Sequence, residues 1–422
     1  MKKLLLTTTA LGLLAASAAN AGSPTVKVGG HADFQVGFGS QENLFENQSN
    51  AGVADGSDNS IFARDLHTRA DTSVTISVDG KADNGLGYGA FIELNADTSA
   101  SEDTAADRTA RRTYIYTETG FGRTEFGSTG DAGDALRVDA STLARATGGI
   151  GGDFTEYVDL GSGAIAAGAT YYITPGLPSA VGLPGEQNHG YGSGGAAGAL
   201  ATNTNHDRAN ANKISYYSPR IHGLQAGISY TPDQGEHGNA EGFSSANGGG
   251  TNFIDVWNAG LNYEKQYDAV SVAASLTGEW GEAKDSGTTA ATIDDLRAYA
   301  IGATISHAGF TIGGSWAKAS EYGAAKAFGS DLRYWTLGGS YEFGPVAASI
   351  TYFDSNVENA TSANAPDQEF RNLSLGLDYK LAPGFMPYIE VSFFETDDNV
   401  ADTATTADNE GSVILVGTQL NF

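Results

Sequence analysis

Charged side chains that could act together fall into two groups in this sequence. The acidic candidates all lie in one long stretch, residues 130–211, and are Asp131, Asp134, Asp139, Asp153 and Glu156. Basic candidates lie outside this stretch, at Arg69, Arg111, Arg123 and Lys213. Acidic and basic groups that face each other across a narrow water-filled gap orient the water and make the passage of large apolar solutes costly. Such selection by an electric field needs a scaffold that holds the two groups apart.

Enzyme chemistry is not indicated by the sequence. It contains no H-E-x-x-H, P-loop or G-x-S-x-G motif, and its seven histidines are scattered. We therefore predict that the protein is not an enzyme and needs no cofactor. Asp397 and Asp398 could bind Ca²⁺ through their carboxylates, although no EF-hand spacing supports such a site.

Composition limits the partners of the chain. The 422 residues carry a formal net charge of −27, so nucleic acid is excluded as a partner because its phosphates need basic residues to neutralise them. There is no cysteine, which rules out disulfides and thiolate chemistry. Aromatic residues make up 10% of the chain, more than is typical of an acidic disordered chain.

The N-terminus, MKKLLLTTTALGLLAASAANAG, has the pattern of a secretory signal peptide. Lys2 and Lys3 precede an apolar stretch, and Ala19-Asn20-Ala21 forms an A-x-A cleavage site. An N-terminal membrane helix is the less favoured interpretation because the apolar run is short and rich in Thr and Ala. We predict a signal peptide over residues 1–21 and a single exported domain over residues 22–422.

Segments of about ten residues with alternating apolar character predict β-strands through the rest of the chain. In RYWTLGGSYEF, Trp335, Leu337 and Phe343 share one face, while Thr336 and Ser340 lie on the other. A soluble β-sandwich would also alternate. We favour a transmembrane antiparallel β-barrel because the polar faces carry little bulk, aromatic residues recur near strand ends, and short and long linkers alternate.

Reversal of chain direction at each linker gives about sixteen strands, the even number that a closed barrel requires. They are expected near 25–38, 66–79, 86–97, 110–119, 121–129, 212–218, 223–231, 254–265, 270–280, 294–307, 309–320, 331–343, 346–354, 369–381, 385–396 and 411–422. Residues 130–211 then form one long third loop, with 164–174 as structure inside it. The alternative is that 164–174 belongs to two extra strands of an eighteen-stranded barrel.

Strand parity predicts which basic side chains face the interior. Val74, Ile76 and Val78 mark the outer face of 66–79, which turns Arg69 inward. Phe126 on the outside turns Arg123 inward, and Ile214 and Tyr216 do the same for Lys213. In 110–119 the alternation does not show which face is apolar, so it predicts no direction for Arg111. Arg111 is a candidate because it belongs to a local basic group with Arg108 and Arg112.

The last strand also shows period two: Phe422, Leu420, Thr418, Val416 and Ile414 share one face. We expect this face to contact lipid and the strand to close the barrel against the first one. An apolar face that leads to a terminal Phe resembles the signal that the barrel-assembly machinery reads in outer-membrane proteins.

Together with the signal peptide, the sixteen strands and the long third loop, two stretches carry a resemblance to a family. FGRTEFGSTGDAGDALR (121–137) is similar to the fifth strand and the start of the third loop of the general diffusion porins of Gram-negative outer membranes. DRANANKISYYSPRIHGLQAGISYTPD (207–233) is similar to the hairpin that follows that loop. The acidic character is similar to the alphaproteobacterial type, whereas segment 138–206 is longer than the family usually has.

The resemblance implies a homotrimer in outer-membrane lipid, with the third loop folded into the lumen and its acidic groups set against basic groups on the wall. It implies passive diffusion of ions and small hydrophilic solutes, and the excess of acid predicts a mild preference for cations. A substrate-specific channel for a sugar or another small solute is the alternative, and a barrel adhesin or hydrolase is a more remote one.

Overall fold

The structure is a computed structural model that describes residues 23–41, 66–96, 110–158, 171–182, 209–238, 253–284, 293–324, 326–358, 366–397, 399 and 408–422. Within these residues, sixteen antiparallel strands form one closed barrel in which each strand pairs with its neighbours in the chain and β1 pairs with β16. The strands are β1 (Thr25–Gln41), β2 (Leu66–Lys81), β3 (Gly87–Asn95), β4 (Ala110–Thr119), β5 (Gly122–Ser128), β6 (Asn212–Tyr217), β7 (Leu224–Asp233), β8 (Phe253–Tyr267), β9 (Val270–Ala283), β10 (Leu296–His307), β11 (Phe310–Tyr322), β12 (Leu332–Phe343), β13 (Val346–Val357), β14 (Gln368–Tyr379), β15 (Phe385–Asp397) and β16 (Asn409–Asn421).

The predicted barrel is confirmed, and each predicted strand end lies within three residues of the observed one. β5 ends at Ser128 and β6 begins at Asn212, so the long excursion predicted at 130–211 joins these two strands. The eighteen-stranded alternative is wrong because the barrel closes with sixteen strands. Residues 171–174 of the doubtful segment form no strand, and 164–170 lie outside the described residues, as does the predicted signal peptide.

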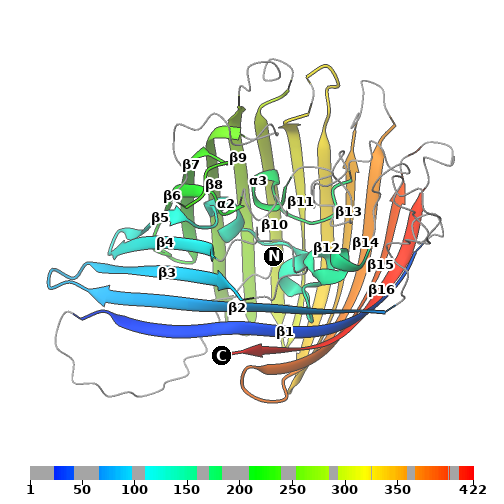
Figure 1. The fold of residues 1–422 in the computed structure, drawn as a ribbon, viewed down its shortest axis with the longest axis horizontal. Helices are drawn as coiled ribbons and strands as arrows, with labels where there is room; N and C mark the ends of the chain where they lie inside the picture. The colour runs from blue at the N-terminus through cyan, green and yellow to red at the C-terminus, as the bar shows by residue number, and fades with distance from the viewer. Residues whose placement is uncertain are drawn as a thin grey trace, which may run out of the picture.

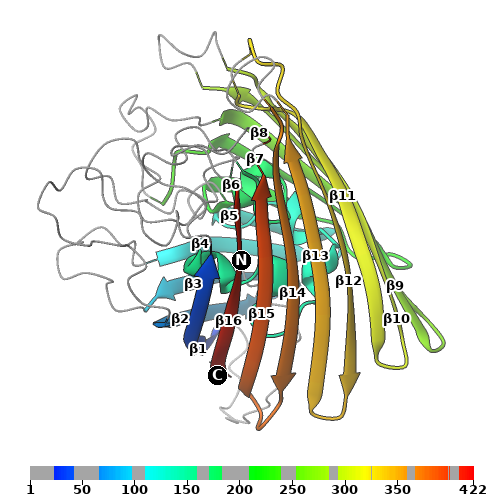
Figure 2. The ribbon, with the colours of Figure 1, turned by 90° about the vertical axis from the view of Figure 1, so that its right-hand side faces the viewer.

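Turns at one end of the barrel are short, and we call this end the short-turn rim. Figure 2 shows the tight connections between β12 and β13 and between β14 and β15 there. Ala308 and Gly309 join β10 to β11 with φ angles of 50° and 84°, and two consecutive positive φ angles are the mark of a tight hairpin turn whose twist matches the strands. The opposite end, the long-loop rim, carries the longer connections.

The outer face of the barrel is apolar along the strands, as the alternation predicts. Trp257 and Leu261 on β8 and Trp335 and Leu337 on β12 are all exposed. Neighbouring strands align these side chains, since Trp316 pairs directly with Trp335. On β16 the predicted outer face is confirmed: Val416 and Leu420 are exposed. An exposed apolar surface of this extent has no partner in water and fits contact with lipid.

The interior holds short helical turns. These are α2 (Ala132–Ala135), η1 (Ala140–Leu143), η2 (Gly149–Gly151), η3 (Asp153–Tyr157) and α3 (Pro178–Val181), all from the excursion between β5 and β6. Figure 1 shows α2, α3 and the neighbouring turns within the curve of the sheet. In the part of the chain that the structure describes, none of the helices has the length and apolar character needed to cross a membrane.

The expectation that the inner face lacks bulk is wrong near the long-loop rim. Inward-facing side chains of the strands from β8 to β16 are fully or almost fully buried there, among them Phe253, Tyr334, Phe353, Phe370 and Leu415. They share one apolar cluster with residues of the excursion, and Phe353 and Phe370 have ring centroids 6.1 Å apart. The alternation itself is intact, because these side chains face inward, but what they meet is protein.

Candidate functional site

Residues 131–158, which we call the inner belt, follow the inner wall of the barrel in the order of the strands. α2 contacts β6 to β9, η1 contacts β11 to β13, η2 contacts β13 to β15, and η3 contacts β16 and β1. The belt therefore begins next to the strand that follows it in the chain and ends at the seam where the barrel closes.

The wall holds the inner belt through its polar inner face. Backbone N–H groups of the belt donate to side chains of successive strands: Ala132 N to Ser229 Oγ (2.8 Å), Val138 N to Ser275 Oγ (2.8 Å), Ala140 N to Thr336 Oγ1 (3.2 Å), Arg145 N to Ser349 Oγ (2.9 Å), and Thr147 N and Gly149 N to Glu390 Oε2 (both 3.1 Å). A short segment cannot satisfy its own backbone groups, so these acceptors offset the desolvation cost of placing it against the wall.

Glycines on the inner face let the belt come close to the wall. A Cβ atom at Gly376 on β14 would lie 2.9 Å from the carbonyl oxygen of Arg145. A Cβ atom at Gly302 on β10 would overlap the carbonyl oxygen of Val138. Any larger residue at these positions would push the belt toward the barrel axis.

Residues 171–182, which we call the covering segment, pack above the belt near the long-loop rim. Tyr172 stacks on Tyr334 of β12 with ring centroids 5.9 Å apart, and Gly176 N donates to the Tyr334 hydroxyl at 3.0 Å. Ser179 N donates to Glu279 Oε1 of β9 at 3.1 Å. The covering segment is thus held against the wall by aromatic contacts and by the buried carboxylate of Glu279.

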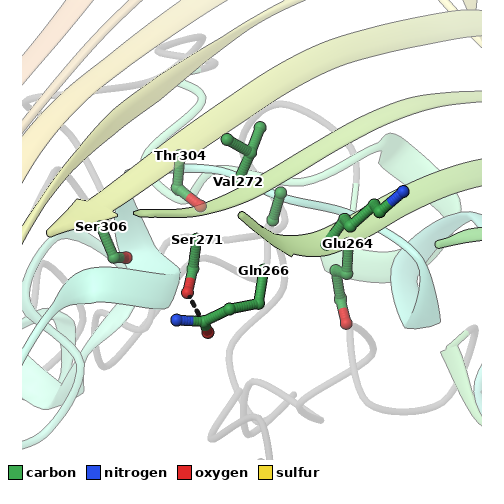
Figure 3. Close-up of a pocket in the computed structure, with 8 residues that line it drawn as sticks. Glu264, Gln266, Ser271, Val272, Thr304 and Ser306 are labelled. Carbon is green, nitrogen blue, oxygen red and sulfur yellow. Dashed lines mark hydrogen bonds between the residues drawn. The ribbon is translucent and has the colours of Figure 1, made fainter. Parts of the chain in front are cut away.

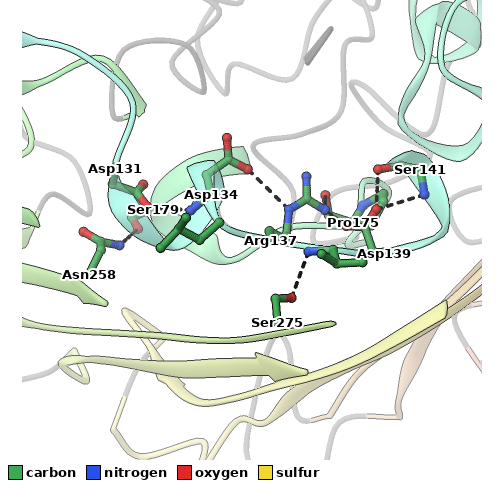
Figure 4. Close-up of polar contacts among 12 residues, drawn as sticks. Asp131, Asp134, Arg137, Asp139, Ser141, Pro175, Ser179, Asn258 and Ser275 are labelled. Atoms are coloured by element: carbon green, nitrogen blue, oxygen red, sulfur yellow. Dashed lines mark hydrogen bonds and ion pairs between the residues drawn. The ribbon is translucent and has the colours of Figure 1, made fainter. Parts of the chain in front are cut away.

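Arg137 joins the inner belt to the covering segment (Figure 4). Its guanidinium lies 3.3 Å from Asp134, forms an ion pair with Asp139, and donates to the carbonyl oxygen of Pro175 at 3.0 Å. Asp134 and Asp139 therefore both pair with an arginine of their own segment. Sequence reasoning did not single out Arg137, although its place between two aspartates was a visible signal.

The end of the belt meets Arg69, the wall residue that parity turned inward. Its guanidinium lies 3.6 Å from Asp153 Oδ2 and 3.7 Å from Glu156 Oε1. Gln35 of β1 donates to the same Asp153 oxygen at 3.1 Å. The structure thus brings together one predicted basic residue and two predicted acidic ones, with two carboxylates for one guanidinium.

A second group of charges lies on β3 and β4. Arg111 and Arg112 lie 3.6 Å and 3.8 Å from the carboxylate of Glu93, and Arg112 Nε donates to Asn210 Oδ1 at 3.1 Å. The pairing of β3 with β4 shifts register between Glu93 and Leu94, which is why the parity of this strand could not be read. This group has two guanidinium groups for one carboxylate.

Arg123 lies on β5, toward the short-turn rim. It forms an ion pair with Glu125 at 2.7 Å, and its guanidinium carbon lies 3.7 Å from the centre of the Tyr116 ring. This cation–π contact and the ion pair hold the side chain flat along the wall.

Lys213 and Asp131 are both buried at the stem of the excursion. Lys213 Nζ donates to the carbonyl oxygens of Thr129 and Ala209, both at 2.6 Å, and so ties the two ends of the excursion together. Asp131 caps α2 by accepting from Asp134 N at 2.8 Å. Burial raises the pKa of Asp131 above its ordinary value, and the nearby Lys213 opposes that effect.

A shallow hollow of about 310 Å³ opens at the short-turn rim between β8, β9 and β10 (Figure 3). Its lining includes Gln266, Ser271 and Ser306, and Ser271 Oγ donates to Gln266 Oε1 at 2.7 Å. Small hydroxyl and amide groups make this part of the rim polar and wettable.

Metal chemistry finds no support in the described part of the chain, where no group of three His, Cys, Asp or Glu side chains could hold an ion. Asp397 ends β15, while Asp398, its partner in the suggested Ca²⁺ site, lies outside the described residues.

Comparisons with known proteins agree with this architecture. An uncharacterized protein of Rickettsia bellii is 26% identical over 480 residues that cover all of both chains. Among solved structures, an anion-selective porin from Comamonas acidovorans matches with a TM-score of 0.54, 16% identity, and coverage of 95% of this chain and 100% of its own. The trimer form of OmpT, an outer membrane protein of Vibrio cholerae, matches with a TM-score of 0.53, 13% identity and the same coverage.

The family model described as "Gram-negative porin" matches residues 7–399. That match spans most of the chain and agrees with the closed barrel of sixteen strands. Membership implies placement in the outer membrane and points to a channel rather than an enzyme. The chain belongs to the Gram-negative porin family.

Proposed function

We propose that this porin forms a water-filled channel for the passive diffusion of ions and small hydrophilic solutes, with a mild preference for cations. The observation that carries the proposal is the contact of Arg69 on the wall with Asp153 and Glu156 of the inner belt. These charges lie side by side on the inner wall, where their combined field would orient water in the lumen, so that large apolar solutes would have to displace that water.

The mildness of the preference follows from the local balance of charge. The belt end has two carboxylates for one guanidinium, whereas the Glu93 group has the reverse. These excesses offset each other, so selectivity is set mainly by the net charge of −27 on the whole chain. The Comamonas porin is described as anion-selective, but its 16% identity supports the fold and not the charge pattern of its channel.

We further propose that the channel is a homotrimer, by likeness to OmpT of Vibrio cholerae, whose matched structure is the trimer form. The C-terminal strand would serve as the signal for the assembly machinery, with Phe422, Leu420, Thr418 and Val416 on its lipid-facing side. Phe422 N donates to Gly30 O at 3.1 Å and Gly30 N donates to Phe422 O at 2.8 Å, so the terminal residue completes the pairing with β1.

Liposome swelling with sugars of graded size tests the proposal most cheaply. A smooth decline of the swelling rate with solute size is the expected result. A single preferred sugar would favour a substrate-specific channel, and no swelling above protein-free liposomes would contradict the channel itself.

A further inference from the structure

We infer that the edges of β1 and β16 recognise each other through two aromatic rings, which we call the register lock, and that the register lock selects how the barrel closes. Its inner half is Tyr388 of β15, whose ring crosses Gly417 of β16 to reach β1. Its outer half is the ring of Phe422, which lies against Gly30 of β1. This role concerns the closure of the barrel and goes beyond the proposed channel function.

The alternation of residues along β1 and β16 leaves their register open. A slip by one residue would turn the apolar face of a strand inward, so the alternation excludes it, but a slip by two residues keeps every side chain on its own face. In a hairpin the turn fixes the register, whereas β1 and β16 lie at opposite ends of the described chain and share no turn. The register also sets the stagger of the strands and hence the tilt and width of the barrel. A contact between side chains is therefore needed to exclude slips by two.

The inner half of the register lock spans three strands. Tyr388, Gly417 and Gln35 lie directly opposite one another across β15, β16 and β1. The Tyr388 hydroxyl donates to Asp33 Oδ1 at 2.8 Å and lies 3.2 Å from Gln35 Oε1. A Cβ atom on Gly417 would overlap that hydroxyl, so glycine is the residue that lets the ring pass over β16.

A slip of β1 by two residues would break this inner contact. Asp33 and Gln35 are consecutive inward residues of β1 and are only 4% and 1% exposed. After a slip, Gly37 or His31 would take the place of one of them beside the Tyr388 hydroxyl. A buried acceptor that loses its donor is costly, so the observed register is favoured over both slipped ones.

The outer half places the terminal ring in a notch. Phe422 and Gly30 are directly paired through both of their backbone groups. A Cβ atom on Gly30 would lie 2.9 Å from Cε2 of the ring and 2.6 Å from the carbonyl oxygen of Ser73 on β2. After a slip by two residues the ring would lie opposite Val28 or Ala32, whose side chains would occupy the space of the notch. The ring thus fits one register of the two strands.

Side-chain sizes along the outer seam agree with this choice. Ala32 lies opposite the larger Leu420, while the larger Phe34 lies opposite Thr418. Thr418 faces outward, yet its Oγ1 is buried and has no hydrogen-bond partner among the described residues. One of the two slips would set Leu420 against Phe34, two large side chains in a space that now holds one.

Strands β2 to β4 carry the same two contacts and provide a matched control. Tyr116 of β4 crosses Gly89 of β3, and its hydroxyl donates to Asp79 of β2. Outside, the ring of Tyr88 lies against Gly80, directly opposite it. Here a turn joins β2 to β3, closed by the bond from Ala82 N to Leu86 O at 2.8 Å. We therefore expect these contacts to add stability without setting the register.

Pairs of cysteines can report the register because the protein has none of its own. Val36 lies opposite Val416, so Val36→Cys with Val416→Cys reports the observed register. Val36→Cys with Thr418→Cys, or with Ile414→Cys, reports a slip by two residues, because residues directly opposite are within reach of a disulfide and those two positions away are not. Each protein would be unfolded in urea, refolded into lipid vesicles without assembly machinery, and oxidised.

Tyr388→Phe keeps the ring over Gly417 but removes the hydroxyl, and Phe422→Ala removes the outer ring. In Tyr388→Phe we expect the ratio of slipped to native disulfides to rise about fivefold, the factor that corresponds to one hydrogen bond. The ratio should rise further when both changes are combined. If the combined variant fails to fold, Tyr388→Phe alone, which lacks a single oxygen atom, decides the outcome.

The matched control uses Tyr116→Phe and Tyr88→Ala, with reporters across β2 and β3. Val74 lies opposite Leu94, so Val74→Cys is combined with Leu94→Cys for the observed register and with Ile92→Cys for the slipped one. The ratio there should stay at its wild-type value, although the melting temperature falls.

A wild-type ratio across β1 and β16 in Tyr388→Phe would overturn the inference. An equal rise across β2 and β3 in the control would overturn it too, because the effect would then be general loosening. The readout uses neither ion current nor the assembly machinery, so its failure is distinct from failure of the proposed channel or of the proposed assembly signal.

Discussion

The ring of Tyr157 in η3 lies directly against the backbone of Gly37 on β1. A Cβ atom on Gly37 would overlap this ring, and no side chain other than that of glycine leaves room for it. The contact fixes the end of the inner belt at the seam where β1 meets β16, just after Asp153 and Glu156, the two carboxylates that reach Arg69. The placement of the belt end against the wall thus depends on a position that carries no side chain.

Replacement of Gly37 by leucine should displace the belt end from the wall. Because the displaced segment also carries Asp153 and Glu156, their ion pairs with Arg69 would lengthen. We expect a changed single-channel conductance and a noisier open state in planar bilayers, with the barrel still folded. Gly120→Ala is the matched control because a Cβ atom there meets nothing within 4 Å. Conductance of Gly37→Leu equal to that of the control would refute the role of this contact.

Replacement of Arg69 by glutamine removes one positive charge from the inner wall beside the belt end. Asp153 and Glu156 then remain without their guanidinium partner. The loss of one unit charge roughly 8 Å from a passing ion in water changes the energy of that ion by about 0.5 kcal/mol, which corresponds to a factor of roughly two in permeability. The cation-to-anion permeability ratio should therefore rise about twofold, read from the reversal potential under a salt gradient. Arg297→Gln on the outer face, where Arg297 pairs with Glu321, should leave the ratio unchanged. A ratio that moves equally in both variants would mean that Arg69 does not face the path.

Replacement of Glu390 by glutamine should loosen the middle of the belt. The carboxylate accepts from Thr147 N, Thr147 Oγ1 and Gly149 N, and an amide offers only one oxygen to these donors. A buried donor left unpaired costs about 1–3 kcal/mol, so the melting temperature in detergent should fall. Glu395→Gln is the control, because Glu395 lies on the same strand but is half exposed on the outer face, and it should melt at the temperature of the wild type. A similar fall of the melting temperature in Glu395→Gln would point to a general effect on β15.

The buried carboxyl of Asp131 should make stability depend on pH. Burial raises its pKa above the ordinary value of 3.8, so the folded protein holds this proton more tightly than the unfolded chain does. The contribution of this group to the free energy of unfolding therefore falls as pH rises from about 4 through the raised pKa, and it is recovered when the pH is lowered again. Asp131→Asn keeps an acceptor for the helix cap and should flatten that slope, measured as melting temperature against pH. Identical slopes in the two proteins would contradict this assignment.

Loss of the terminal ring should impair assembly more than stability. Phe422 is exposed on the outer face, and its backbone already pairs with Gly30. If the ring is read by the assembly machinery, Phe422→Ala should lower the amount of folded protein in the outer membrane, while Phe422→Tyr should preserve it. Equal amounts of all three proteins in membrane fractions would argue against a role in recognition.

Much of the fold could be predicted because lipid outside a barrel imposes a constraint on every second residue. Strands such as β12 and β14 show this alternation without interruption, and their ends follow from turn residues such as Ala308-Gly309. The inward direction of Arg69 came from the same rule. Prediction was hardest at β4, where the register shift beside Glu93 breaks the period of two and conceals the contact of Arg112 with Glu93.

The interior could not be predicted in the same way. Phe353 and Phe370 look like ordinary inward residues of a wet barrel, and only their contacts with a segment some two hundred residues earlier in the chain make that side dry. Asp134 and Asp139 have the acidic character expected of a constriction, but both form ion pairs with Arg137 of their own segment. Loop paths depend on such distant contacts, which local periodicity does not encode.

The reversal potential of single channels in a planar bilayer under a tenfold gradient of potassium chloride tests the proposed channel most directly. We expect discrete current steps and a potential whose sign shows a mild preference for potassium over chloride. A membrane that stays silent with correctly folded protein present, or a clear preference for chloride, would contradict it.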